Sequence, residues 1–198
     1  MKKPRQIGFI ASLFLILSLN VSAQDLKNYF SISEISLLNT VYKLAWSSHP
    51  NAVYYKHEYL AAGEKPESFK TMVMIDAIIK DLPIEKVVGL KESELQERKK
   101  TDKVCNYQIM DNSQTGEYMI DFLMSSGKGE NLDIVEWNVY RYKKIIDSKG
   151  NPVILLFAMS KRAYGNDITT FLTGLKSNRT DWINLIGNYK LPTIDIKD

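Results

Sequence analysis

The sequence predicts a single α+β domain of two layers, in which an antiparallel sheet of about five to seven strands carries helices packed on one face. Several short segments alternate apolar and polar residues between turn-forming residues, which is typical of antiparallel strands. Two longer segments repeat apolar residues at helical spacing. No stretch within residues 24–198 has the composition of a linker. We therefore expect one domain over residues 24–198, preceded by a signal peptide over residues 1–23.

The first 23 residues have the three parts of a secretory signal. Lys2, Lys3 and Arg5 form a basic start, residues 7–19 form an apolar run, and the segment ends in small residues at Ala23. The apolar run has 13 residues, whereas a membrane-spanning helix needs roughly 20. We expect cleavage after Ala23 rather than an uncleaved anchor. The mature protein is then expected to be soluble, periplasmic or secreted, and without stable membrane insertion.

The charge of the predicted mature chain excludes one class of function. Residues 1–23 contain three of the 26 Lys and Arg residues and none of the 23 Asp and Glu residues, so the mature chain carries no formal net charge. Binding to nucleic acid requires a concentrated basic surface that releases counterions from phosphates. The balanced composition predicts no nucleic-acid partner.

The first half of the domain is predicted to be mostly strand. Residues 24–39 are ambiguous, because Ser31 and Glu34 have the spacing of a weak capping box for a short helix. Residues 40–47 and 52–60 read as two strands joined by a turn that contains Pro50. The apolar run 71–79 fits a central strand covered on both sides, with a helix as the competing interpretation.

The second half is predicted to contain two helices and four strands. Pro83 opens a helix over residues 83–100, because proline suits a first helical turn. A second helix extends from about Asp167 to Asn188, with apolar residues on one stripe. Short turns between consecutive strands favour a meander. The four predicted strands are residues 104–110, 117–125, 134–145 and 153–162.

No spacing in the sequence identifies a reaction. Patterns for a nucleophile elbow, a phosphate-binding loop, a dinucleotide fold or a zinc protease are absent. Cys105 is the single cysteine, so an intrachain disulfide is excluded, and we expect its thiol to be buried and structural. His49 is expected to be a turn residue. The sequence therefore predicts no cofactor, no metal site and no assigned catalytic residue.

The segment EWNVYRY, residues 136–142, has two faces that both look occupied. Period-two alternation places Trp137 and Val139 on one face, which we expect to lie beneath the terminal helix. Beyond them, Arg141 is expected to extend past the core with its charged end in solvent. The opposite face is expected to gather the candidate binding residues Glu136, Asn138, Tyr140, Tyr142, Asp121 and His57.

Three interpretations of this polar and aromatic face remain open. It can be a solvated sheet surface, in which cross-strand pairs contribute little. It can be a recognition surface, since tyrosine supplies rigid contact area with a polar tip. It can also be an acid/base site built on Asp121 and Glu136, which requires a suitable separation and one raised pKa.

The arrangement of these segments resembles a known family. The segment YYKHEYL (residues 54–60), the segment EWNVYRY and a terminal helix that contains Trp182 follow one another in an order similar to that of small PsbP-like domains. Bacterial exported proteins of unknown function with a tyrosine-rich strand pair are similar as well. The resemblance covers residues 40–187. It implies a binding or assembly factor without catalytic residues, and no individual site residue is transferred by it.

Together these observations predict an exported, soluble, noncatalytic binding or assembly module of the bacterial cell envelope. It would recognise an envelope protein or a small ligand through its tyrosine-rich sheet face. The alternative is a small periplasmic hydrolase that uses Asp121, Glu136 or His57.

The signal sequence generates the first testable prediction. Sequencing the N-terminus of the exported protein should show Gln24 as the first residue, because the small residues before it suit signal peptidase. A protein that starts at Met1 and remains in the membrane fraction would contradict this prediction.

Overall fold

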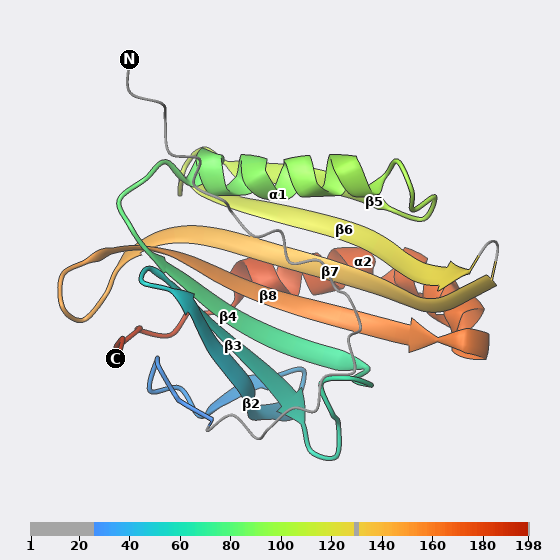
Figure 1. Cartoon of the computed structure of the whole chain (residues 1–198), viewed down its shortest axis with the longest axis horizontal. Helices are drawn as coiled ribbons and strands as arrows, with labels where there is room; N and C mark the ends of the chain where they lie inside the picture. The colour runs from blue at the N-terminus through green and yellow to red at the C-terminus, as the bar shows by residue number, and fades with distance from the viewer. Residues whose placement is uncertain (1–25, 129–130, 198) are drawn as a thin grey trace.

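The computed structural model describes residues 26–128 and 131–197, so the predicted signal peptide lies outside the described residues. The described residues form eight strands and two α-helices, with all eight strands in one antiparallel sheet (Figure 1). The elements are β1 (Glu34–Leu37), β2 (Thr40–Asn51), β3 (Tyr54–Ala61), β4 (Thr71–Ile79), α1 (Ile84–Arg98), β5 (Asn106–Asn112), β6 (Glu117–Lys128), β7 (Asn131–Ile146), β8 (Pro152–Tyr164), the short 3-10 turn η1 (Gly165–Asp167) and α2 (Ile168–Asn188).

The strand order in the sheet is β1-β2-β3-β4-β8-β7-β6-β5. Each half of the chain is therefore a meander, and the two halves meet where β4 pairs with β8. This pairing extends over all of β4, from Thr71 opposite Lys161 to Ile79 opposite Val153. The predicted meander of the four later strands is confirmed.

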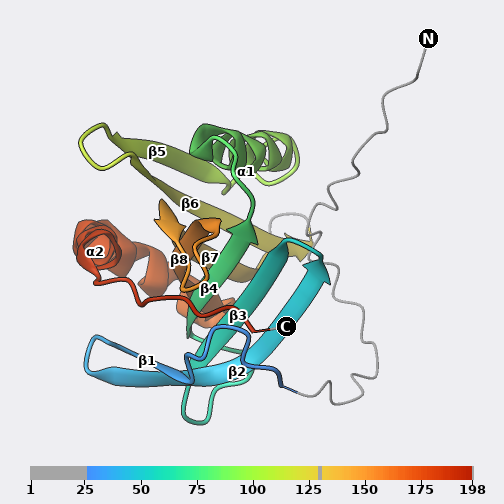
Figure 2. The same ribbon diagram turned by 90° about the vertical axis from the view of Figure 1, so that its left-hand side faces the viewer.

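The predicted fold class is wrong in two respects. The sheet has eight strands instead of five to seven, and the two described helices do not share a face. Helix α1 packs on β6 and β7, whereas α2 packs on β7 and β8 from the other side (Figure 2). The result is three layers. Both faces of the central strands are apolar enough to be buried, so one helix is required on each.

The two sides of the sheet are named here by their helices. The α1 face carries the even-numbered residues of β7, including Tyr142, and the α2 face carries the odd-numbered ones, including Trp137. On the α2 face the core continues past the helix to Ile194 and Ile196 of the C-terminal segment.

Trp137 lies beneath the terminal helix, as predicted. Its side chain is 1% exposed, and its ring centroid is 5.3 Å from that of Trp182 on α2. Its indole Nε1 donates a hydrogen bond to the Asp121 carboxylate, which also forms an ion pair with Arg179 of α2. The tryptophan thus packs against the helix and is also tied to it through a carboxylate.

Two local predictions for the first half are corrected and one is confirmed. The ambiguous N-terminal region forms β1 instead of a helix, and Ser31 has a φ of 57°, far from the extended conformation of an N-cap residue. The expected turn around Pro50 belongs to β2, where an irregularity in pairing between Ser48 and Asn51 accommodates it. The strand over residues 71–79 is confirmed as β4.

Arg141 was expected to extend into solvent, but it is buried. Its Nε donates to Glu117 Oε2 at 2.7 Å. Its Nη1 donates to the carbonyl oxygens of Ile186 at 3.1 Å and Tyr189 at 2.8 Å, at the end of α2. Carbonyls in the last turn of a helix have no partner within the helix, so Arg141 attaches this end of α2 to the sheet.

The packing of Trp137 leads to a stability prediction. Replacing Trp137 by Ala should lower the free energy of unfolding by about 3–5 kcal/mol, the usual cost of deleting a large buried aromatic. Urea unfolding of the mature chain measures this value. The control is Trp46→Ala, since Trp46 is half-buried on β2; equal losses in the two variants would contradict the packing described here.

Candidate functional site

Four of the six predicted site residues lie together on the α1 face. They are Glu136, Asn138, Tyr140 and Tyr142 of β7. This face is not a solvated surface, because Glu136 is 8%, Asn138 0% and Tyr142 4% exposed. The interpretation of these residues as the wet side of a sheet is therefore wrong.

The other two predicted residues, Asp121 and His57, lie on the α2 face. Asp121 is paired with Val139 across β6 and β7, and directly paired residues point to the same side of a sheet. Its carboxylate is engaged by Trp137 and Arg179. The expectation that one face would gather all six residues is corrected, because the pairing register decides this and the sequence does not contain it.

His57 has a structural environment among aromatic residues. Its Nε2 accepts a hydrogen bond from the backbone N–H of Tyr29 at 3.0 Å, and its Nδ1 is 2.9 Å from the Tyr59 hydroxyl. The Tyr59 hydroxyl donates to the carbonyl of Ile32, so Nδ1–H is the donor to Tyr59. The imidazole is neutral in this arrangement, and burial lowers the pKa of His57 to about 4.

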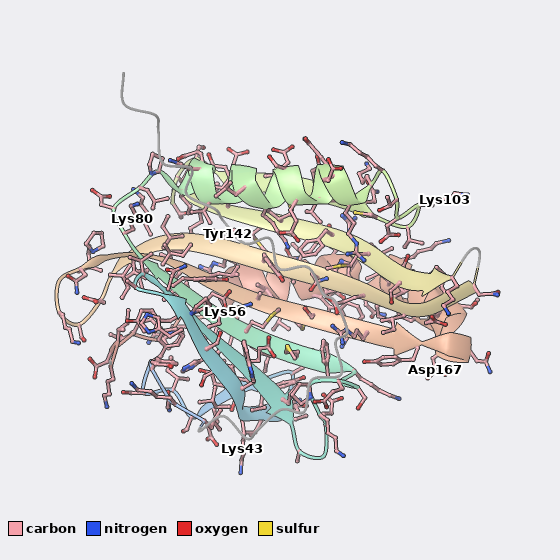
Figure 3. The ribbon with its side chains drawn as sticks, viewed as in Figure 1. Lys43, Lys56, Lys80, Lys103, Tyr142 and Asp167 are labelled. Carbon is pink, nitrogen blue, oxygen red and sulfur yellow. The ribbon has the colours of Figure 1, made fainter. Side chains whose placement is uncertain are left out.

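Several polar residues on the α1 face were missed by the sequence reasoning. The segment YYKHEYL places His57 on the α2 face, and the same alternation places Tyr54, Lys56 and Glu58 on the α1 face. Asp76 joins them from β4 as the single charged residue in the buried run 71–79. Figure 3 shows Lys56 on β3 and Tyr142 on β7. An acid inside an otherwise apolar strand was the signal that could have revealed this group.

Asp76 has one satisfied and one unsatisfied carboxylate oxygen. The Tyr54 hydroxyl donates to Oδ2 at 2.5 Å, whereas Oδ1 is buried without a hydrogen-bond partner. The side chain is 5% exposed, and this burial raises the pKa of Asp76. Buried polar atoms in proteins are nearly always hydrogen-bonded, so an exception requires an explanation.

Glu58 is the neighbouring acid on β3. Burial raises the pKa of Glu58 to about 7, and the negative charges of Asp76 and Glu136 add to the increase. The positive charges of Lys56 and Arg162 oppose it. Glu58 is consequently a carboxyl group whose protonation changes near neutral pH.

Asn138 provides the second unsatisfied group on the α1 face. The Ser160 hydroxyl donates to Asn138 Oδ1, and Asn138 Nδ2 is buried without a partner. Two residues along β7 from Asn138, the Glu136 carboxylate forms an ion pair with Arg162 of β8. Glu136 is therefore neutralised, whereas the amide of Asn138 retains a free donor.

The two unsatisfied groups lie on either side of a small apolar position. Ala158 of β8 is paired with Met74 on β4 and with Tyr140 on β7. Asp76 on β4 and Asn138 on β7 lie diagonally across Ala158 of β8. They are separated by two strand-to-strand spacings and by four residues along the strands, so their Cα atoms are roughly 16 Å apart. The α1 face thus combines two polar ends with an apolar middle.

Helix α1 adds a cation above the aromatic side of this arrangement. The Lys91 ammonium lies 4.9 Å from the ring centroid of Phe122 and 5.3 Å from that of Tyr140. Within residues 26–128 and 131–197, no group of three His, Cys, Asp or Glu side chains could hold a metal ion. Cys105 is buried on the same face, where burial raises the pKa of its thiol.

A comparison with protein families matches residues 31–191, which is well over half of the chain. The chain belongs to this family. The family is uncharacterised, so membership supplies neither an activity nor a location. No curated protein matches the chain, and no solved structure matches it. None of the helices in the described part of the chain is long and apolar enough to span a membrane.

The environment of His57 generates a prediction on pH dependence. Because the folded pKa is near 4 and the unfolded value is about 6.5, the unfolded state binds more protons between these values, and stability falls as the pH is lowered through this window. The free energy of unfolding should drop by roughly 1–2 kcal/mol between about pH 7.5 and 5 through this residue.

The measurement is urea unfolding of the wild type and of His57→Asn at both pH values, where the variant should lose this part of the pH dependence. His49→Asn is the matched control, because His49 is exposed. The opposite contribution of Glu58 is present in all three proteins and cancels in the comparison. An unchanged pH dependence in His57→Asn would show that the buried imidazole is not responsible.

Proposed function

We propose that this chain is an exported, noncatalytic binding module of the bacterial cell envelope that holds a small ligand on its α1 face. Three buried side-chain atoms of the described residues have no hydrogen-bond partner, namely Asp76 Oδ1, Asn138 Nδ2 and, on β2, Ser48 Oγ. The first two support the proposal most directly, because they lie on either side of the apolar position at Ala158. An unsatisfied buried polar group costs about 1–3 kcal/mol. A ligand that supplies one donor and one acceptor would remove both costs.

The residues between the two atoms define the shape of such a ligand. Ala158 has the smallest side chain in the middle of this face, with Met74 and Tyr140 at its sides. An apolar body that spans this region, with a donor group at the Asp76 end and an acceptor at the Asn138 end, complements the face. Ligand sites in proteins commonly combine apolar walls with a few placed polar groups.

A small ligand has more support than a protein partner at this place. The tyrosine-rich part of the face packs with α1 in one apolar cluster, and Tyr142 is buried in it. A protein partner that recognised these tyrosines would need them at the surface, because hot-spot residues of interfaces make direct contact with the partner. A small ligand needs contact only with Asp76, Asn138 and the residues between them.

The hydrolase alternative has less support from the geometry. Glu136 lies on the α1 face, while Asp121 and His57 lie on the α2 face, so Glu136 cannot act on one substrate with either of them. Each is also engaged, Glu136 by Arg162 and Asp121 by Arg179. A general base must reach the proton that it removes.

Native mass spectrometry of the mature protein purified from the periplasm tests the proposed function. The wild type should retain a small molecule as a mass adduct, and Asp76→Asn and Asn138→Leu should reduce its occupancy by about tenfold, because each removes one polar contact. Asp111→Asn is the control, since Asp111 is exposed on the edge strand β5.

Circular dichroism establishes that each variant is folded before the spectra are compared. A wild type without any adduct, or an adduct that both α1-face variants retain at full occupancy, would contradict the proposal.

A further inference from the structure

The α1 face also indicates the chemical class of the ligand. We propose that the ligand carries a protonated amine, which is held by the free carboxylate oxygen of Asp76 with Glu58 beside it. This inference rests on the proposed function, because it assumes that the α1 face is the ligand site.

The first argument is the balance of charge. Three acids lie on the α1 face in β3, β4 and β7, namely Glu58, Asp76 and Glu136. Arg162 pairs with Glu136. The cations that act on Asp76 are Lys56 on β3 and Lys91 on α1, and those that act on Glu58 are Lys56 and Arg162. Among the described residues, neither Glu58 nor Asp76 forms a salt bridge with any of these cations, so their charges act on the two acids only from a distance.

The position of Lys56 does not satisfy either acid directly. Its ammonium is 5.9 Å from the ring centroid of Trp46 and 6.0 Å from that of Tyr54. Among the described residues, no salt bridge joins Lys56 to Glu58 or Asp76, and Oδ1 of Asp76 stays unpaired. A hydrogen bond from a second cation to this oxygen would replace no existing hydrogen bond.

The surroundings of Asp76 suit an organic cation. Tyr54 is bound to its other oxygen, and the charge of Asp76 acts on the hydroxyls of both Tyr140 and Tyr142. Aromatic rings attract desolvated ammonium groups through their quadrupoles. Apolar side chains, Met74 beside Asp76 on β4 and Leu156 opposite it on β8, complete the wall. A metal ion would instead need several oxygen, nitrogen or sulfur ligands.

Proton release from Glu58 provides a way to measure amine binding. With a pKa raised to about 7 by burial and by the neighbouring acids, Glu58 is partly protonated at neutral pH. An added positive charge favours its ionised form. Amine binding at about pH 7 should therefore release a proton. The groups that act on Glu58 are Lys56 on β3, Asp76 on β4, Glu136 on β7 and Arg162 on β8.

The experiment uses the mature full chain and three probes with one skeleton: phenethylamine, 2-phenylethanol and phenylacetate. Isothermal titration calorimetry at about pH 7, repeated in buffers of different ionisation enthalpy, measures both affinity and proton release. The amine should bind most tightly. Asp76→Asn should weaken its binding by about 10- to 100-fold, as expected for loss of a charged hydrogen-bond partner.

Glu58→Gln should abolish proton release while the amine still binds. Glu67→Gln, at an exposed position, is the matched control and should behave like the wild type. Amine binding that is insensitive to Asp76→Asn, or failure of the amine to bind at millimolar concentration, would overturn the inference.

The probes separate this inference from the proposed function. If the alcohol or the carboxylate binds more tightly than the amine and is weakened by Asn138→Leu, the α1 face is a ligand site but the amine assignment is wrong. If none of the probes binds and the purified protein carries no adduct, both proposals fail.

Discussion

The whole structure depends on the burial of β7 on both of its faces. This 16-residue strand pairs with β6 and β8 along its length, and it contacts α1 on one side and α2 on the other. In the sheet, β6 and β5 follow β7 on one side and β8 follows it on the other. The pairing of β8 with β4 joins the first four strands to this group. A strand in this position has no solvated face, so each polar side chain on it must find a partner within the fold or from a ligand.

The two faces meet this requirement differently. On the α2 face, Asp121 binds Trp137 and Arg179, and His57 binds the backbone of Tyr29 and the hydroxyl of Tyr59. These polar groups attach the helix and the N-terminal segment to the sheet. On the α1 face, Asp76 and Asn138 each retain an atom without a partner. This asymmetry, rather than the number of tyrosines, distinguishes the candidate ligand site from a polar core that serves only the fold.

The segments of the fold were largely predictable from local patterns. Alternation and turn residues located β3 and the four later strands, and helical spacing located α1 and α2 near their observed bounds. The errors occurred where local chemistry competes with pairing. Ser31 and Glu34 have the spacing of a helix cap, yet the segment that follows pairs with β2, and Pro50 continues a strand through an irregular stretch. Hydrogen bonds to a neighbouring strand outweigh such weak local preferences.

The sequence by itself determined which residues share a side of each strand, because side chains alternate strictly along an extended chain. It therefore grouped Glu136 with Asn138, Tyr140 and Tyr142, and it placed Trp137 opposite them. Only the tertiary structure decided which sides of different strands form the same face of the sheet, since this depends on which strands pair and in which register. The register of β6 on β7 placed Asp121 on the α2 face. The pairing of β4 with β8, two strands far apart in the chain, placed His57 on that face as well and brought Asp76 and Glu58 beside the tyrosines.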